Sequence, residues 1–221
     1  MKHLISILLI LSFISGLAQT SNKIRVLVIP PSRFEFVSEF SLEEIAKKNE
    51  ITAPMVFVTY EKALLNTFEK FYDENLEFIA VNPSGLKPYK KMFKYEYGKF
   101  DGKRYNAVNL KYFQEIEFTN LLKSYGADFV IFITWYDIQK ESFTRKGKQS
   151  KRAPYAAHYL DFDIYNLFKQ QIAGVGKVKA EADTPNDQEV SFSLLRVKEL
   201  EMAYANFIGK VVDVLNKPIE P

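Results

Sequence analysis

The chain has 221 residues, with 30 lysines and arginines against 27 aspartates and glutamates, so its formal net charge is only +3. This balance is too small to predict a nucleic-acid partner from bulk charge, while 47% hydrophobic residues provide for a sizeable core. Cysteine is absent, which excludes disulfide bonds, thiolate metal sites, a cysteine nucleophile and a lipidated cysteine.

The first eighteen residues have the pattern of a secretory signal peptide. A basic Lys2 precedes the apolar run 4–14, and the small residues Gly16 and Ala18 form a cleavage motif. The apolar run is shorter than the roughly 20 residues that a membrane span needs. We therefore expect cleavage after Ala18, export to the periplasm or the exterior, and a single α/β domain over 19–221. No transmembrane segment is expected after signal cleavage.

A strand and two helices are predicted to open this domain. Apolar β-forming residues run from Lys23 to Ile29 and end at two prolines, and both faces of this strand are apolar, as in the middle of a sheet. Ser41 begins a capping-box pattern for a short helix through Lys48. A longer helix is predicted over 54–72. Its apolar stripe consists of Phe57, Tyr60, Leu64, Phe68 and Phe71.

A second strand and an inserted β-hairpin follow. The strand is predicted over 76–81 and ends in strong turn residues, so the first unit is strand, helix, strand. Between Lys91 and Leu110, aromatic and charged residues alternate on both sides of Asp101-Gly102, a tight-turn dipeptide. We expect this hairpin to protrude from the domain.

The second half of the chain is predicted to contain a helix, three strands and a long final helix. The first helix covers 115–125, with Gly126 as its left-handed cap. The most hydrophobic run of the mature chain, 129–135, is expected at the sheet centre and to pair with 158–167. The same alternation continues through 182, where Gly174, Gly176 and Ala180 are predicted to let a helix approach closely.

The final helix is predicted from Phe192 to Leu215 because an apolar stripe runs along it before Lys217-Pro218. Together the elements predict an α/β (α+β) fold. A mixed β-sheet of about four to five strands is packed by helices and carries the inserted β-hairpin.

Three stretches are similar to a known domain. They are the opening strand with its two prolines (24–31), the join Gly126-Ala127-Asp128 before an apolar strand, and the strand pair 160–182 followed by one long helix. Together they resemble the periplasmic α/β domain shared by the amino-terminal part of the Tol-system translocation protein and the curli-export lipoprotein family. This resemblance implies a non-catalytic envelope domain that acts through protein contacts. The lipidated cysteine of the curli-export relatives is missing, so a pore role is not expected.

Catalytic and metal sites find little support in the sequence. His158 is the only histidine after the signal peptide, and strand alternation turns Asp161 away from it. A Gly-x-Ser-x-Gly motif and the paired histidines or cysteines of a zinc site are absent. We therefore predict no catalytic residue, no metal ligand and no cofactor, and we place Asp161 and Asp163 on a solvated strand face. A hydrolase that uses His158 is the less favoured alternative.

Two basic stretches are candidate contact surfaces. The candidate contact surface on the hairpin consists of Tyr89, Lys91, Phe93, Lys94, Tyr95, Tyr97, Phe100, Lys103, Arg104 and Tyr105. The secondary basic loop, in the connection 140–152, consists of Arg145, Lys146, Lys148, Lys151 and Arg152. Rings beside lysines suit an anionic or sugar-bearing partner. Alternatively, these lysines keep the protein soluble and block sheet-edge pairing.

The sequence as a whole predicts an exported, non-catalytic binding or assembly module of the bacterial cell envelope. Its expected partner is an unknown envelope protein or an anionic envelope component. A carbohydrate- or lipid-binding envelope protein that uses the aromatic hairpin is the alternative.

Overall fold

A computed structural model describes residues 23–81, 84–144, 152–180 and 195–217. The fold is the expected mixed α/β architecture, with helices packed on a large sheet and a separate two-stranded hairpin. The predicted signal peptide and the start of the predicted final helix, at Phe192, lie outside the described residues.

The large sheet has the order β3-β1-β6-β7-β8, and a short strand, β2, pairs with the far part of β6. β1 runs parallel to β3 and β6, whereas β6, β7 and β8 are antiparallel neighbours, so the sheet is mixed. Its strands are β1 (Ile24–Ile29), β2 (Phe36–Ser38), β3 (Leu76–Ala80), β6 (Phe129–Thr144), β7 (Arg152–Asn166) and β8 (Gln171–Ala180).

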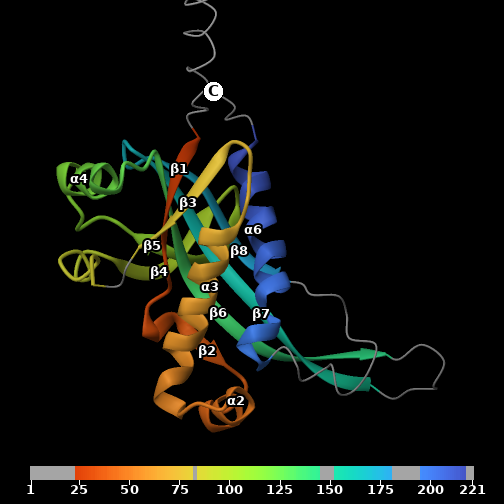
Figure 1. The fold of residues 1–221 in the computed structure, drawn as a ribbon. Helices are drawn as coiled ribbons and strands as arrows, with labels where there is room; N and C mark the ends of the chain where they lie inside the picture. The colour runs from red at the N-terminus through yellow and green to blue at the C-terminus, as the bar shows by residue number, and fades with distance from the viewer. Residues whose placement is uncertain (1–22, 82–83, 145–151, 181–194, 218–221) are drawn as a thin grey trace, which may run out of the picture.

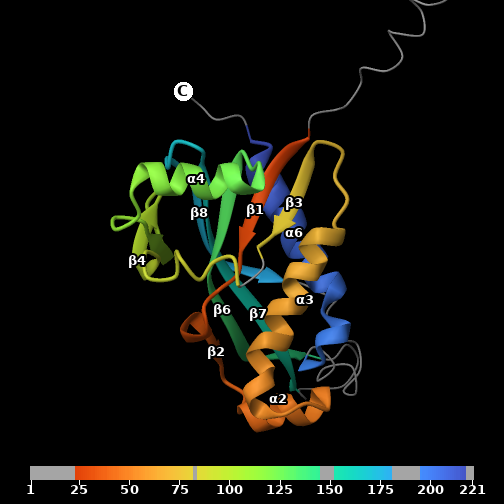
Figure 2. The same cartoon turned by 60° about the vertical axis from the view of Figure 1, so that its left-hand side comes forward.

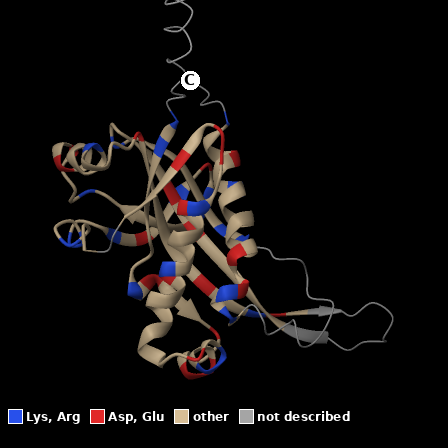
Figure 3. Cartoon of the chain, in the orientation of Figure 1, with Lys and Arg blue, Asp and Glu red and all other residues tan. Residues whose placement is uncertain are grey.

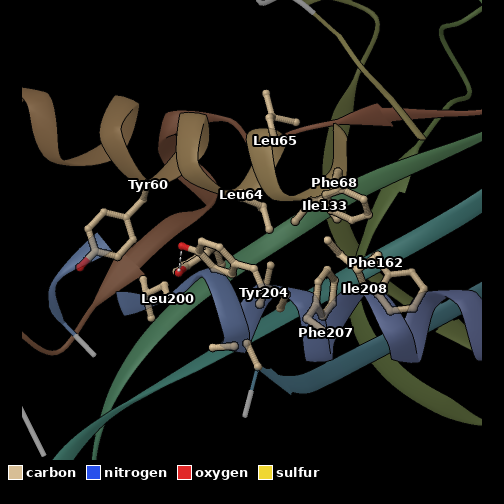
Figure 4. Close-up of a cluster of buried hydrophobic side chains, with 14 of the residues drawn as sticks. Tyr60, Leu64, Leu65, Phe68, Ile133, Phe162, Leu200, Tyr204, Phe207 and Ile208 are labelled. Atoms are coloured by element: carbon tan, nitrogen blue, oxygen red, sulfur yellow. Dashed lines mark hydrogen bonds between the residues drawn. The ribbon is translucent and has the colours of Figure 1, made fainter. Parts of the chain in front are cut away.

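Two long helices, α3 and α6, cover one face of this sheet (Figure 1). The apolar stripes predicted on both helices meet there, and the side chains that they bring together include Tyr60, Leu64, Phe68, Tyr204 and Phe207 (Figure 4). The helices of the described chain are α2 (Leu42–Asn49), α3 (Val56–Lys70), α4 (Glu115–Tyr125) and α6 (Glu201–Leu215). Short 3-10 turns lie at Arg33–Glu35, Ala53–Met55 and Val197–Glu199.

The opposite face of the sheet is covered by α4 and by the hairpin of β4 (Lys94–Phe100) and β5 (Lys103–Asn109) (Figure 2). β1 therefore lies between two cores, as its two apolar faces predicted. Val26 and Val28 enter the core under α3 and α6. Leu27 and Ile29 enter the core under α4.

The prediction that the hairpin protrudes from the domain is wrong, because β5 packs against the sheet. Tyr105, Ala107 and Val108 of this strand are buried. The prediction that small residues on β8 admit a helix is also wrong for Gly174 and Gly176. A methyl group added at either glycine would overlap with Tyr105, so these two glycines make room for the hairpin.

A β-bulge explains why the alternation on β8 misled the prediction. Val175 pairs with Phe162 and Val178 pairs with Leu160, so two β8 residues oppose one on β7. Lys177 lies in this bulge with a positive φ of 54°. The residues that face the helices are therefore odd-numbered just before the bulge and even-numbered after it. A prediction that assumes a regular period of two cannot include this change.

The described residues of the predicted loop over 140–152, which are 140–144 and 152, belong to strands. β6 continues to Thr144 and β7 begins at Arg152, and Lys140 pairs with Ala156 in their antiparallel ladder. Local cap predictions are confirmed: the Ser41 side chain accepts the Glu44 N–H, and Gly126 ends α4 in the left-handed region.

Candidate functional site

The hairpin meets the large sheet edge-on, through the backbone of β5. The N–H of Asn106 donates to Asp161 Oδ2 at 2.9 Å, and the N–H of Val108 donates to Asp163 Oδ2 at 2.7 Å. Both donors therefore point away from β4 and toward β7. The two carboxylates satisfy backbone groups that a neighbouring strand would otherwise bind.

The carbonyl groups on the same edge are also bound by side chains. The Thr134 hydroxyl donates to the carbonyl oxygen of Asn106, and the Tyr165 hydroxyl donates to that of Val108 at 3.4 Å. Both hydroxyls come from the large sheet. Side chains of β6 and β7 thus replace a third strand and fix the hairpin by its inner edge.

This arrangement corrects the prediction that Asp161 and Asp163 form a solvated strand face. Their exposed fractions are 3% and 0%. Asp161 also accepts the side-chain amide of Asn106 at 2.9 Å and the backbone N–H of Lys177 at 2.6 Å. The carboxylates are buried because the hairpin covers them, and the donors of the hairpin replace water.

Asp163 is the more enclosed of the two. The Tyr105 hydroxyl donates to its Oδ1, and the Gln171 amide donates to the same oxygen at 2.7 Å. Burial raises the pKa of Asp163 to about 6, and the charge of Asp161 adds to this effect, while the hydrogen bonds oppose it. The interior contact of the hairpin therefore contains a carboxyl group that titrates near neutrality.

The outer edge of the hairpin follows from the inner one. Asn106 lies opposite Tyr97 and Val108 lies opposite Tyr95 in the antiparallel ladder. Where one residue of such a pair turns its backbone groups away from the partner strand, the opposite residue does the same. Tyr95 and Tyr97 therefore point their N–H and C=O groups outward, and Lys99 continues this edge. Within the described chain no strand pairs with that side of β4.

The structure divides the candidate contact surface on the hairpin into three groups. Its exposed members are Lys91, Lys94, Tyr97, Lys103 and Arg104. Its half-buried members are Tyr89, Tyr95 and Phe100, and its buried members are Phe93 and Tyr105. Phe93 packs against the Phe132 ring at a centroid distance of 5.3 Å. The two buried rings belong to the core, so the available surface is smaller than the sequence predicted.

Of the secondary basic loop, Arg152 lies within the described residues. Arg145, Lys146, Lys148 and Lys151 lie outside the described residues, and Arg152 is the first residue of β7. A contact role for this basic stretch stays a prediction.

His158 lies in the core under α3 and α6, with an exposed fraction of 0%. Its Nδ1 is 2.8 Å from the Tyr136 hydroxyl, which is 2.7 Å from the Tyr204 hydroxyl. Asp161 binds the hairpin on the opposite side of the sheet, as strand alternation predicted. The described residues contain no group of three or more acidic, histidine or cysteine side chains suited to a metal ion.

A groove of about 930 Å³ runs between α2, α3 and the start of α6. The sequence does not predict this groove, because its walls come from segments far apart in the chain. Both signs of charge lie side by side on α2, which borders the groove (Figure 3). Its charged lining residues are Glu44, Lys47, Lys48, Glu50, Lys70, Arg196, Lys198 and Glu201. Tyr204, which joins the buried hydroxyl pair with Tyr136, also borders this groove.

No helix among the described ranges is long and apolar enough to cross a membrane. Comparison with known proteins finds no matching family model and no matching curated protein. Several solved structures are distantly similar. One is a hypothetical protein, CT253, from Chlamydia trachomatis, at 10% identity and a TM-score of 0.42, covering 89% of this chain and 99% of that chain.

A second similar structure is described as that of a neuraminyllactose-binding hemagglutinin homologue from Helicobacter pylori. It is 11% identical, with a TM-score of 0.42, and the match covers 89% of this chain and 85% of that one. Likeness at this level assigns neither a fold family nor a function. The resemblance to the Tol-system and curli-export domain stays a prediction.

Proposed function

We infer that this chain is an exported, non-catalytic binding or assembly module of the cell envelope that contacts its partner through the outer side of the hairpin. Export rests on the signal-peptide pattern of the first eighteen residues. The contact surface rests on the exposed side chains of β4 and of the turn that follows it.

The observation that carries this proposal is how the chain uses its polar side chains. His158 is sealed in the core against a tyrosine hydroxyl, and Asp161 and Asp163 bind the backbone of β5. These groups hold the fold together, so they favour a structural role over hydrolysis by His158. In contrast, Tyr97 is 82% exposed, and exposed aromatic rings beside basic groups are typical of binding surfaces.

The test compares a hairpin variant with a matched surface variant. The double change Tyr97→Ser and Arg104→Ser removes exposed side chains without touching the inner edge of β5. Phe168→Ser is the control, because Phe168 is also 82% exposed but lies between β7 and β8. Each mature protein, residues 19–221, is immobilised and incubated with solubilised envelope, and the retained components are identified.

We expect the wild type and the Phe168→Ser control to retain the same component, and the hairpin variant to lose it. Equal retention by all three proteins contradicts the proposal. Retention of polysaccharide or of anionic vesicles in place of a protein would favour the alternative, a carbohydrate- or lipid-binding envelope protein.

A further inference from the structure

We propose that the outer edge of β4 binds an extended acidic peptide segment of the partner, which adds to the hairpin as a third strand. This inference rests on the proposed function and specifies its partner. The backbone groups of Tyr95, Tyr97 and Lys99 supply the hydrogen-bonding edge. An extended peptide adds to such an edge through main-chain hydrogen bonds.

The edge is accessible at its centre. Tyr97 is the middle residue of β4, and its side chain is 82% exposed. Lys94, Glu96 and Lys99 are also exposed, while Gly98 between them has no side chain to cover the backbone. A second strand can therefore approach β4 over most of its length.

The edge is also held in place before a partner arrives. Thr134, Asp161, Asp163 and Tyr165 fix the backbone of β5 from the other side. β5 in turn holds β4 through a seven-residue antiparallel ladder. An edge that is already ordered loses little conformational entropy on binding. A peptide therefore adds to this edge more favourably than it would to a hairpin that is not fixed against a sheet.

Charge selects an acidic occupant. Residues 94–104 include four basic side chains, Lys94, Lys99, Lys103 and Arg104, and two acidic ones, Glu96 and Asp101. Glu96 is engaged by the side-chain amide of Asn109 at 2.9 Å. The local field around the edge is therefore positive, and it attracts acidic segments and disfavours a second copy of the same edge.

The experiment measures binding of a fluorescent ten-residue peptide of alternating glutamate and valine to the mature protein, by fluorescence anisotropy. Two further peptides are compared with it. One is N-methylated at two consecutive central residues, which blocks both edges of a peptide strand, and one has lysine in place of glutamate. The protein variants are Tyr97→Pro, which removes an outward N–H, and Tyr97→Ala, which keeps this N–H and removes the ring.

We expect the acidic peptide to bind the wild type, and to lose much less affinity with Tyr97→Ala, which lacks only the ring contact, than with Tyr97→Pro. Binding should weaken by about tenfold or more in Tyr97→Pro and for the N-methylated peptide, since both lose main-chain hydrogen bonds. The lysine peptide should not bind. Proline is tolerated where the N–H of an edge strand faces solvent, and circular dichroism checks the fold of this variant. The N-methylated peptide tests the same point on the unaltered protein.

Several outcomes would overturn the inference. The first is that the wild type fails to bind the acidic peptide. The second is that the methylated or the basic peptide binds as well as the acidic one. The third is that Tyr97→Ala loses as much affinity as Tyr97→Pro. A dimer in sedimentation experiments that Tyr97→Pro abolishes would make a second copy the occupant. If Tyr97→Pro still retains the envelope component that the Tyr97→Ser, Arg104→Ser variant loses, the proposed function stands and strand addition falls.

Discussion

Asp163 is expected to make the protein more stable as the pH falls from 7 toward 4. Its carboxyl group is fully buried and accepts hydrogen bonds from Tyr105, Val108 and Gln171. Burial, with the charge of Asp161, still raises its pKa from 3.8 to about 6. The folded protein therefore binds this proton more tightly than the unfolded chain does. Stability is gained as the pH falls through 6, and the gain is complete below 3.8.

The size of the effect follows from the shift in pKa. A rise from 3.8 to about 6 is roughly two units, and each unit corresponds to about 1.4 kcal/mol. The full gain on account of Asp163 alone is thus about 3 kcal/mol, of which about 2.5 kcal/mol should appear in the free energy of unfolding between pH 7 and pH 4. The change Asp163→Asn removes this titration. It also gives the donors around the site an amide in place of a carboxylate, at a cost of about 1–3 kcal/mol.

The assay is urea unfolding of the wild type and Asp163→Asn at pH values from 4 to 7.5, followed by the fluorescence of the single tryptophan, Trp135. Other titrating groups are common to both proteins, so the difference between the two curves isolates Asp163. We expect the wild type to gain stability relative to the variant as the pH falls. If it instead loses stability relative to the variant in this range, the donors outweigh burial and the reasoning is refuted.

Three further predictions concern other buried contacts. Gly174→Ala should lower the free energy of unfolding by about 1–3 kcal/mol because its methyl group overlaps with Tyr105, and a double-mutant cycle with Tyr105→Ala should show a smaller loss. Burial raises the pKa of Glu141, but hydrogen bonds from Lys179 and two tyrosines outweigh burial and lower this pKa to about 2. The wild type should therefore lose stability relative to Glu141→Gln as the pH falls from 4.5 to 2. Tyr136→Phe removes a hydroxyl that links two buried side chains, and its Tm in calorimetry should fall by several degrees.

Each of these predictions has a contradicting result. Equal losses for Gly174→Ala in both backgrounds would mean that Tyr105 is not the obstacle. A stability difference between wild type and Glu141→Gln that is independent of pH would place the carboxylate outside its hydrogen-bond network. An unchanged Tm for Tyr136→Phe would show that the hydroxyl contributes no net stability.

Elements with a local cause were predictable from sequence. α2 begins where the Ser41 side chain accepts an N–H of the first turn, and α4 ends where Gly126 adopts a positive φ of 60°. Both signals need only the residues beside them. The parallel unit of β1, α3 and β3 was predictable for a related reason, because turn residues and hydrophobic periods separate its elements clearly.

The docking of the hairpin was not predictable, because its causes are distant in the chain. Asn106 and Asp161 are 55 residues apart, and the residues beside each of them do not predict the hydrogen bond between them. The bulge at Lys177 also shifts the parity of β8 by one residue. Alternation therefore assigned Gly174 and Gly176 to the helix face, whereas they face Tyr105.

The candidate contact surface was predictable in its charges and less so in its rings. Exposed lysines follow from the cost of burying an unpaired charge, so Lys94 and Lys103 lie on the surface. A tyrosine ring can be covered or exposed, and the sequence does not say which face of a hairpin packs. Tyr105 is covered and Tyr97 is not, because β5 packs against the large sheet more extensively than β4 does.

Both edges of the hairpin have backbone N–H and C=O groups that point away from the partner strand, but these groups have different surroundings on the two edges. On the inner edge, the N–H groups of Asn106 and Val108 are bound by the carboxylates of Asp161 and Asp163. The outward N–H of Tyr97 belongs to the same kind of edge, with exposed lysines beside it. On the buried edge Asp163 accepts its hydrogen bond at the cost of a raised pKa, since water is excluded there. On the exposed edge an acidic peptide would stay hydrated and would not bear this cost, which is why acidic strand addition is favoured on that side.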